Sequence, residues 1–154
     1  MSSEYGRFLE EFHSGDIIIH EPAKTITESD NNLFCLLTMN HHPLHLDKVY
    51  AEGTEFGQRV VVGTLVFSLV VGLTVRDISG KAIANLDYEN VHHEASVFIG
   101  DTIRAESEIL SVRCSRSKPD RGIIRVKTSA YNQNNRLVLT FIRNVLIPIR
   151  GSDD

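Results

Sequence analysis

The chain has 154 residues, of which 42% are hydrophobic and 23% charged, and this composition is typical of one soluble globular domain covering 1–154. A formal charge of −4 gives no general electrostatic attraction to nucleic acid or to an anionic membrane surface. The N-terminus lacks a signal-peptide pattern, no apolar run is long enough to span a membrane, and Cys35 and Cys114 are far apart, which together predict a reduced, cytoplasmic setting.

A strand and then a helix are expected at the N-terminal end. Residues 16–27 alternate weakly between apolar and polar side chains, which favours a strand. Thr27 or Ser29 can cap the helix that follows, and one apolar face of this helix is formed by Leu33, Leu36 and Leu37. The helix must end near His42, because the next residue is a proline. Residues 38–45 are therefore predicted to leave the helix and enter a loop, where catalytic side chains are often placed.

A long buried helix is expected in the middle of the chain. Residues 60–80 are apolar on almost every side of a helical wheel, with a main stripe formed by Val62, Leu65, Val66, Leu69, Val70 and Leu73. The many β-branched residues make a strand the competing interpretation. A strand of this length is rare, so a helix from Thr64 to Ile78 is predicted, with Gly80 as its stop signal.

The remainder of the chain is predicted to form strands. Their expected positions are 81–97, 102–113, 122–131 and 136–149, with turns at 100–102 and 132–136. A helix that is apolar all round must be covered on several sides, so a sheet of long antiparallel strands has to curl around it. The pattern therefore predicts an α+β fold, a curled antiparallel sheet wrapped around a long central helix.

An ordered set of motifs extends over residues 10–149. Pro43, Leu44 and His45 resemble the signature of MaoC-like dehydratases and R-specific enoyl-CoA hydratases, which reads Gly-Asp-x-Asn-Pro-Leu-His followed by an acidic residue. Further matches follow in register at Tyr50-Ala51, Phe56-Gly57, Val62-Gly63-Thr64, Tyr88-Glu89-Asn90-Val91 and Phe98-Ile99-Gly100-Asp101-Thr102. The resemblance implies a hotdog fold, a hydro-lyase acting on an acyl-CoA thioester without a cofactor, and at least a homodimer.

The sequence departs from this signature at two positions. Asn40 stands where the family has its catalytic aspartate, and His42 stands where the family has an asparagine. An amide cannot take a proton at neutral pH. The resemblance therefore leaves His45 as the only matching base, with Asn40 orienting the water and His42 among the substrate-binding candidates. Some MaoC-like proteins with branched or dicarboxylic C5 substrates are similar to this variant, which favours a mesaconyl-CoA, itaconyl-CoA or methylmalyl-CoA type substrate.

The implied hydration needs a base and a site for developing negative charge. Histidine titrates near neutral pH, so His45 can take a proton from water and return it to the α-carbon. The transition state places negative charge on the thioester oxygen, which free amides at the start of a buried helix stabilise. Gly63 has no side chain to obstruct the substrate there, and the Thr64 amide is the next donor along the helix.

Two charged clusters have alternative interpretations. Residues 113–127 carry six basic residues and one acidic residue, including Arg116 and Arg121, and form either a solvated face or a site for the phosphates of coenzyme A. His41, His42 and His45 cluster with Asp47, and His92 and His93 follow later in the chain. A His-rich metal site is the alternative, but none of these residues has the spacing of a zinc motif, so no metal is predicted.

Two other functions stay open at this stage. A thioesterase would attack the carbonyl carbon instead of the β-carbon, and such enzymes are not expected to carry the His-Pro-Leu-His loop. A non-catalytic acyl-CoA-binding hotdog protein is the other alternative, because Asn40 replaces the usual carboxylate.

Overall fold

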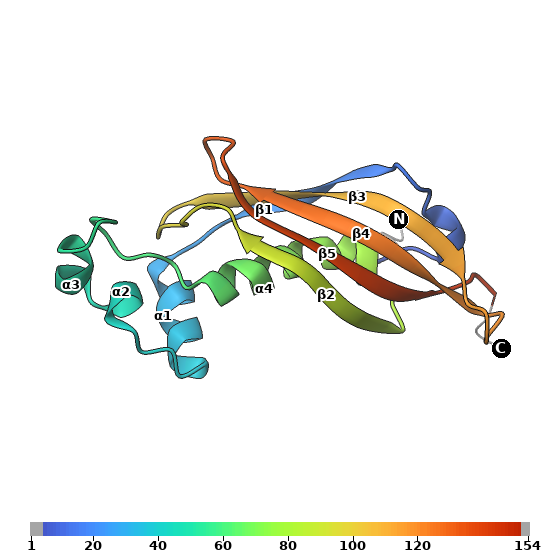
Figure 1. Ribbon diagram of the computed structural model, residues 1–154, viewed down its shortest axis with the longest axis horizontal. Helices are drawn as coiled ribbons and strands as arrows, with labels where there is room; N and C mark the ends of the chain where they lie inside the picture. The colour runs from blue at the N-terminus through green and yellow to red at the C-terminus, as the bar shows by residue number, and fades with distance from the viewer. Residues whose placement is uncertain (1–4, 152–154) are drawn as a thin grey trace.

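The computed structural model describes residues 5–151 and places a long helix along one face of a five-stranded antiparallel sheet (Figure 1). Residues 1–4 and 152–154, which belong to the predicted domain 1–154, lie outside the described residues. In chain order the elements are η1 (Leu9–Glu11), β1 (Ile17–Thr25), α1 (Glu28–Leu37), α2 (Pro43–Leu46), α3 (Lys48–Glu52), α4 (Gly63–Thr74), the π-helical turn η2 (Val75–Ser79), β2 (Ala84–His93), β3 (Thr102–Cys114), β4 (Arg121–Tyr131) and β5 (Leu137–Pro148).

The sheet has the strand order β1-β3-β4-β5-β2, so that β1 and β2 form its two edges. Every neighbouring pair is antiparallel. The period-two pattern of the sequence is confirmed in β3 and β4, because burial alternates along both strands. The buried side chains on these strands include Ile103, Ala105, Ser107, Ile109, Ile124, Val126, Thr128 and Ala130.

The helix α4 confirms the prediction of a central helix over the competing strand. It begins at Gly63, and η2 continues it to Ser79. The fully covered stripe consists of Val66, Val70, Thr74 and Ile78. Phe67 packs edge to face against Phe141 of β5, with ring centroids 5.2 Å apart. The sheet therefore covers most of the helix, while the stripe of Thr64, Ser68 and Gly72 stays exposed.

The region before α4 differs from the sequence-based expectation. The predicted apolar face of α1 is not buried by the chain, since Leu33, Leu36 and Leu37 are 59%, 58% and 72% exposed. The helix instead packs through Asn31 and Cys35. Part of the predicted loop is helical as well, because Pro43 occupies the first position of α2 and the His42 Nδ1 atom accepts a hydrogen bond from the Leu44 amide. His45 therefore lies in a helical turn. Within residues 5–151 no helix is long and apolar enough to cross a membrane.

A buried polar network crosses the sheet beside η2. The His20 ring donates from Nδ1 to Asp77 at 2.8 Å, and its Nε2 atom lies 2.7 Å from the hydroxyl oxygen of Ser107. Ser107 in turn lies 2.8 Å from the hydroxyl of Thr128. Burial lowers the pKa of His20 below its usual value, although the hydrogen bond and the charge of Asp77 oppose this effect. The imidazole is therefore neutral in the folded protein near neutral pH.

We expect His20 to make the fold less stable as the pH falls. The unfolded chain protonates this imidazole near pH 6.5, whereas the folded protein resists protonation until a lower pH. The unfolded state therefore binds more protons in this interval, and the stabilisation that is complete above pH 6.5 is lost as the pH decreases. Urea unfolding of the native protein and of His20→Gln between about pH 8 and pH 5 measures this effect. The difference in unfolding free energy should shrink towards pH 5; a constant difference would contradict the assignment.

Candidate active site

The imidazole of His45 is oriented by a main-chain carbonyl. Its Nδ1 atom lies 2.7 Å from the carbonyl oxygen of Val60, in the segment that leads into α4. A carbonyl oxygen only accepts hydrogen bonds, so Nδ1 carries the proton in the neutral ring. The Nε2 atom then holds the free electron pair. His45 is therefore fixed in the tautomer that can accept a proton from water through Nε2.

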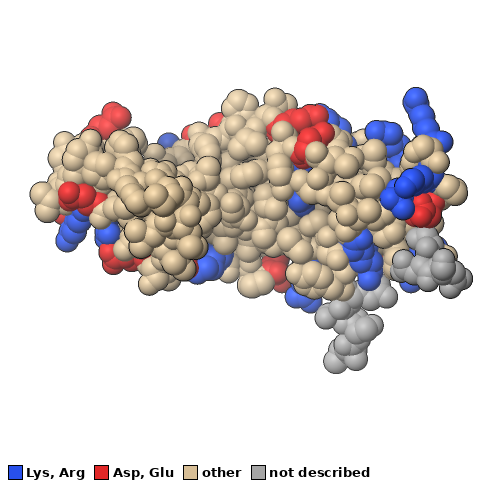
Figure 2. All heavy atoms as spheres, turned by 90° about the horizontal axis from the view of Figure 1, so that it is seen from below, with Lys and Arg blue, Asp and Glu red and all other residues tan. Residues whose placement is uncertain are grey.

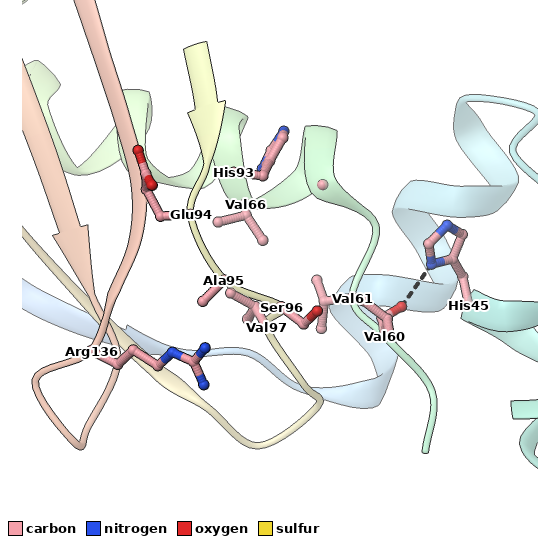
Figure 3. A pocket seen from close by; sticks show the side chains of 11 residues that line it. His45, Val60, Val61, Val66, His93, Glu94, Ala95, Ser96, Val97 and Arg136 are labelled. Carbon is pink, nitrogen blue, oxygen red and sulfur yellow. Dashed lines mark hydrogen bonds between the residues drawn. The ribbon is translucent and has the colours of Figure 1, made fainter. Parts of the chain in front are cut away.

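A cavity of about 450 Å³ lies beside His45 at the start of α4 (Figure 3). Three parts of the chain meet there: the segment from α2 to α4, the residues at and after the end of β2, and the turn between β4 and β5. The lining residues are His45, Val60, Val61, Gly63, Val66, His93, Glu94, Ala95, Ser96, Val97 and Arg136. Val61, Val66 and Val97 are buried, so the cavity combines an apolar wall with polar groups from distant segments.

The first two backbone amides of α4, those of Gly63 and Thr64, have no acceptor among the residues that the structure describes. The Leu65 and Val66 amides both donate to the Val62 carbonyl, but the Gly63 and Thr64 amides make no such bond within 5–151. Gly63 lines the cavity, whereas Thr64 is exposed and is not one of the lining residues. Of the two residues predicted to donate, the structure therefore places Gly63 at the same cavity as His45. A free amide at the first turn of a helix favours negative charge nearby.

The ring of His93 lies close to the Cα atom of Gly63. A Cβ atom added to Gly63 would lie 3.0 Å from Cε1 and 3.1 Å from Nε2 of His93. His93 is the last residue of β2 and its side chain is exposed. His93 was not predicted from the sequence as a catalytic or substrate-binding residue, because only the fold brings the end of β2 against the start of α4.

A buried amide connects the two sides of the site. The Asn31 side chain is fully buried, its Nδ2 atom donates to the His45 carbonyl at 3.0 Å, and its Oδ1 atom accepts from the Val62 amide at 3.1 Å. Asn31 was missed by the sequence analysis. The one available signal is a polar residue on the side of α1 opposite to its leucines, which by itself does not distinguish a buried amide from a solvated one.

Asn40 and His42 lie next to His45 in sequence but outside the cavity lining. The Oδ1 atom of Asn40 accepts a hydrogen bond from the His42 amide at 3.3 Å. The His42 ring caps α2 and lies edge to face with His45, with ring centroids 6.0 Å apart. Their roles in orienting water and binding substrate remain predictions, and the structure adds that both residues stabilise the turn that carries His45.

Arg116 and Arg121 are not brought to the His45 cavity. Arg121 begins β4, and both residues belong to the hairpin at the end of the sheet away from α1–α3 (Figure 1). Lys and Arg side chains gather at that end (Figure 2). The Arg121 guanidinium is paired with Asp120, with Nε 2.8 Å from Oδ1. Binding of coenzyme A phosphates by these two residues remains a prediction.

Arg136 is the basic residue that lines the cavity. It follows the turn between β4 and β5, whose geometry is fixed because Asn132 Oδ1 accepts from the amides of Asn134 and Arg136 at 2.9 Å and 3.1 Å. Its guanidinium has no ion-pair partner among residues 5–151 and extends beside Ser96 and Val97 (Figure 3). The sequence analysis interpreted this segment only as a turn.

The histidines at the site do not form a metal cluster with the other described residues. Among residues 5–151 no group of three or more His, Cys, Asp or Glu side chains is arranged to hold a metal ion. The polar side chains that line the cavity around its apolar wall are those of His45, His93, Glu94, Ser96 and Arg136.

The chain resembles known proteins over nearly its whole length. Residues 12–132 match the model of the MaoC-like domain family. A mesaconyl-CoA hydratase of Cereibacter sphaeroides is 33% identical over 152 residues, which are 99% of this chain and 44% of the relative. An (R)-specific enoyl-CoA hydratase of Aeromonas caviae is 31% identical over 115 residues, which are 75% of this chain and 81% of the relative. The chain thus spans less than half the length of the first of these two.

Solved structures share the fold. A putative MaoC domain protein dehydratase from Chloroflexus aurantiacus J-10-fl superposes with a TM-score of 0.93 at 32% identity, covering 100% of this chain and 44% of that chain. A Mycobacterium tuberculosis protein described as a double hotdog fold superposes with a TM-score of 0.85 at 20% identity, covering 97% of this chain and 46% of that chain. The predicted hotdog architecture, with a curled antiparallel sheet and a central helix, is confirmed.

Proposed function

The chain belongs to the MaoC-like domain family, and on this basis we propose that it adds water to, or removes water from, the α,β double bond of an acyl-CoA thioester. The proposal rests on an oriented base beside a free helix amide: the His45 Nδ1–H donates to the Val60 carbonyl, and Gly63, whose amide has no acceptor among the described residues, lines the same cavity. The names of the hydratase relatives support the reaction class.

The side chains suffice for a balanced hydration. Nε2 of His45 takes a proton from water as the water oxygen bonds to the β-carbon, and the electron pair of the double bond moves onto the thioester oxygen. The Gly63 amide stabilises this enolate oxygen. The imidazolium then returns its proton to the α-carbon, so the double bond is replaced by one C–O and one C–H bond. Dehydration follows the same steps in reverse.

A C5 dicarboxylic substrate of the mesaconyl-CoA type has a candidate partner in Arg136, although the Glu94 carboxylate lines the same cavity. The relative from Cereibacter sphaeroides is named for this substrate. Arg136 lines the cavity without an ion-pair partner in the described part of the chain, and a guanidinium can bind a carboxylate through two parallel hydrogen bonds. Asn40 replaces a carboxylate close to the base, which removes a negative charge that would repel a dicarboxylic acyl group.

Incubation with a panel of enoyl-CoA thioesters, followed by mass analysis, tests the reaction and its substrate together. We expect a gain of one water on mesaconyl-CoA.

In Asn40→Asp the carboxylate still accepts from the His42 amide, so the turn should persist. The ratio of kcat/KM for mesaconyl-CoA over straight-chain crotonyl-CoA should fall about tenfold in this variant, which corresponds to roughly 1.4 kcal/mol of repulsion. Release of free coenzyme A without hydration would contradict the proposal, and an unchanged ratio would contradict the dicarboxylic substrate.

We also propose a homodimer joined along β2. This edge strand exposes Leu86, Tyr88 and Val91, and exposed apolar edges favour pairing with another strand. The opposite edge, β1, also exposes Ile17 and Ile19, but it contains Pro22 and Lys24, residue types that protect edges from pairing. Since β2 ends at the cavity residue His93, pairing there would bring a second chain close to the site. Light scattering at micromolar concentration should give about twice the chain mass of 17.3 kDa, and a monomer would contradict this assembly.

A further inference from the structure

We infer that Asn31 is a positioning residue, which holds the base His45 and the first amides of α4 in a fixed mutual arrangement. The kinetic consequences of this inference rest on the hydratase activity proposed above. The structural consequences do not, because they concern only the orientation of the His45 ring.

The hydrogen bonds of the Asn31 amide have one assignment. A carbonyl oxygen must accept and a backbone N–H must donate, so the atom facing the His45 carbonyl is the NH2 group and the atom facing the Val62 amide is the oxygen. The side chain is 0% exposed, so water does not compete for either bond. One rigid, planar group thus joins α1 to both α2 and the start of α4.

The two hydrogen bonds of Asn31 act together with the hydrogen bond from the His45 ring to the Val60 carbonyl. Asn31 holds the main chain at His45 on one side and at Val62 on the other, and the His45 ring then reaches Val60, two residues before Val62. Gly63 follows Val62 directly, so its free amide is located by the same contact. A displacement at Asn31 would therefore move the proton acceptor and the oxyanion donor relative to each other.

An apolar residue of the same size cannot replace this amide without cost. Leucine at position 31 would leave the buried Val62 N–H and the His45 carbonyl without partners, and unpaired buried groups destabilise the arrangement that buries them. The segments would move apart until water reached these groups. A displacement of about 1 Å at a catalytic group can lower the rate by about 10²-fold.

The kinetic test compares Asn31→Leu with Asn32→Leu. Both variants replace an asparagine of α1 by leucine, but the Asn32 side chain makes no hydrogen bond to the site among the described residues. We expect kcat for mesaconyl-CoA hydration to fall about 10- to 100-fold in Asn31→Leu with little change in KM, because the geometry of the reacting groups changes rather than the uniform binding of substrate. Asn32→Leu should stay close to the native protein.

Asn31→Asp supplies a pH-dependent rescue. An ionised carboxylate would face the His45 carbonyl with a negative oxygen, whereas a protonated carboxyl group can donate to that carbonyl and accept from the Val62 amide, as asparagine does. The activity of Asn31→Asp relative to the native protein should therefore rise as the pH is lowered. Protonation would also stabilise the folded state of this variant, so urea unfolding at each pH is measured together with the activity, and the recovery must exceed the recovery of the folded fraction. This variant also keeps the test informative if Asn31→Leu does not fold.

A third measurement does not depend on activity. In protein with ¹⁵N-labelled histidine, the ring shifts of His45 report which nitrogen carries the proton. The native protein should show the Nδ1–H tautomer, and Asn31→Leu, or Asn31→Asp at neutral pH, should show a mixture. If the native protein does not hydrate any thioester but the variants change the tautomer, the proposed function fails and the positioning role stands. Unchanged kcat and an unchanged tautomer in the Asn31 variants would overturn the inference.

Discussion

Replacement of His45 by alanine should lower kcat for hydration by about 10²- to 10⁴-fold, the range expected for loss of a general acid–base group. The structure gives the reason for this large effect. The ring is held as the Nδ1–H tautomer by the Val60 carbonyl, so its Nε2 atom is a ready proton acceptor beside the cavity. Asn40, which stands where the family has its catalytic aspartate, cannot take a proton in its place.

His41→Ala is the matched control for this experiment. His41 belongs to the same segment, is exposed and does not line the cavity, so its removal should leave kcat nearly unchanged. Circular dichroism and urea unfolding of both variants separate chemistry from folding, and we expect both to fold because His45 is only half-buried. Native hydration rates in His45→Ala would exclude the mechanism. Equal losses of kcat in the two variants would indicate that the segment carrying His45 is disturbed, and not that a base has been removed.

Replacement of Gly63 by proline should lower kcat about 10²- to 10³-fold relative to replacement by alanine, as for the removal of one oxyanion donor. Both substitutions add a Cβ atom that meets the His93 ring at 3.0 Å, but only proline removes the backbone N–H. Proline is well tolerated at the first position of a helix. The preceding residue, Val62, already has φ −59° and ψ 128°, which suits a residue before proline.

The comparison of the two Gly63 variants isolates the amide. Steady-state kinetics on mesaconyl-CoA gives the ratio of kcat values, and the helix content of each variant shows whether α4 still begins at this point. Gly63→Ala itself should have a modest effect, because the exposed His93 ring can move away from the added methyl group. If Gly63→Pro is as active as Gly63→Ala, the free amide does not stabilise the transition state.

Local sequence patterns predict most of the fold, whereas the choice of His45 as the candidate base comes from the resemblance to the MaoC-like signature. The alternation in β3 and β4 and the all-round apolar character of α4 are local properties, and both are confirmed. The hotdog arrangement was inferred from the motif that contains His45, and the solved structures confirm it. By contrast, the exposure of the α1 leucines depends on how α1 sits against the rest of the chain, which a helical pattern does not specify.

The polar residues around the cavity could not be predicted from local patterns, because they are joined only by the fold. Asn31, His93 and Arg136 come from a helix, a strand end and a turn, far apart in the sequence. The location of the basic cluster illustrates the same difficulty. The 13 residues of β3 extend for about 40 Å at roughly 3.3 Å per residue, so a hairpin at its far end is carried well away from its start. Sequence spacing alone does not reveal which end of the strand faces the cavity.

His45 is oriented by a main-chain oxygen, and this affects how the site can change in evolution. Every amino acid supplies the carbonyl that accepts from Nδ1, so the orientation of the ring is independent of the side chain at position 60. That same side chain forms part of the cavity wall. Substitutions of Val60 can therefore change the shape of the cavity wall while His45 keeps its tautomer, so that changes in what the cavity accepts are separated from the orientation of the imidazole.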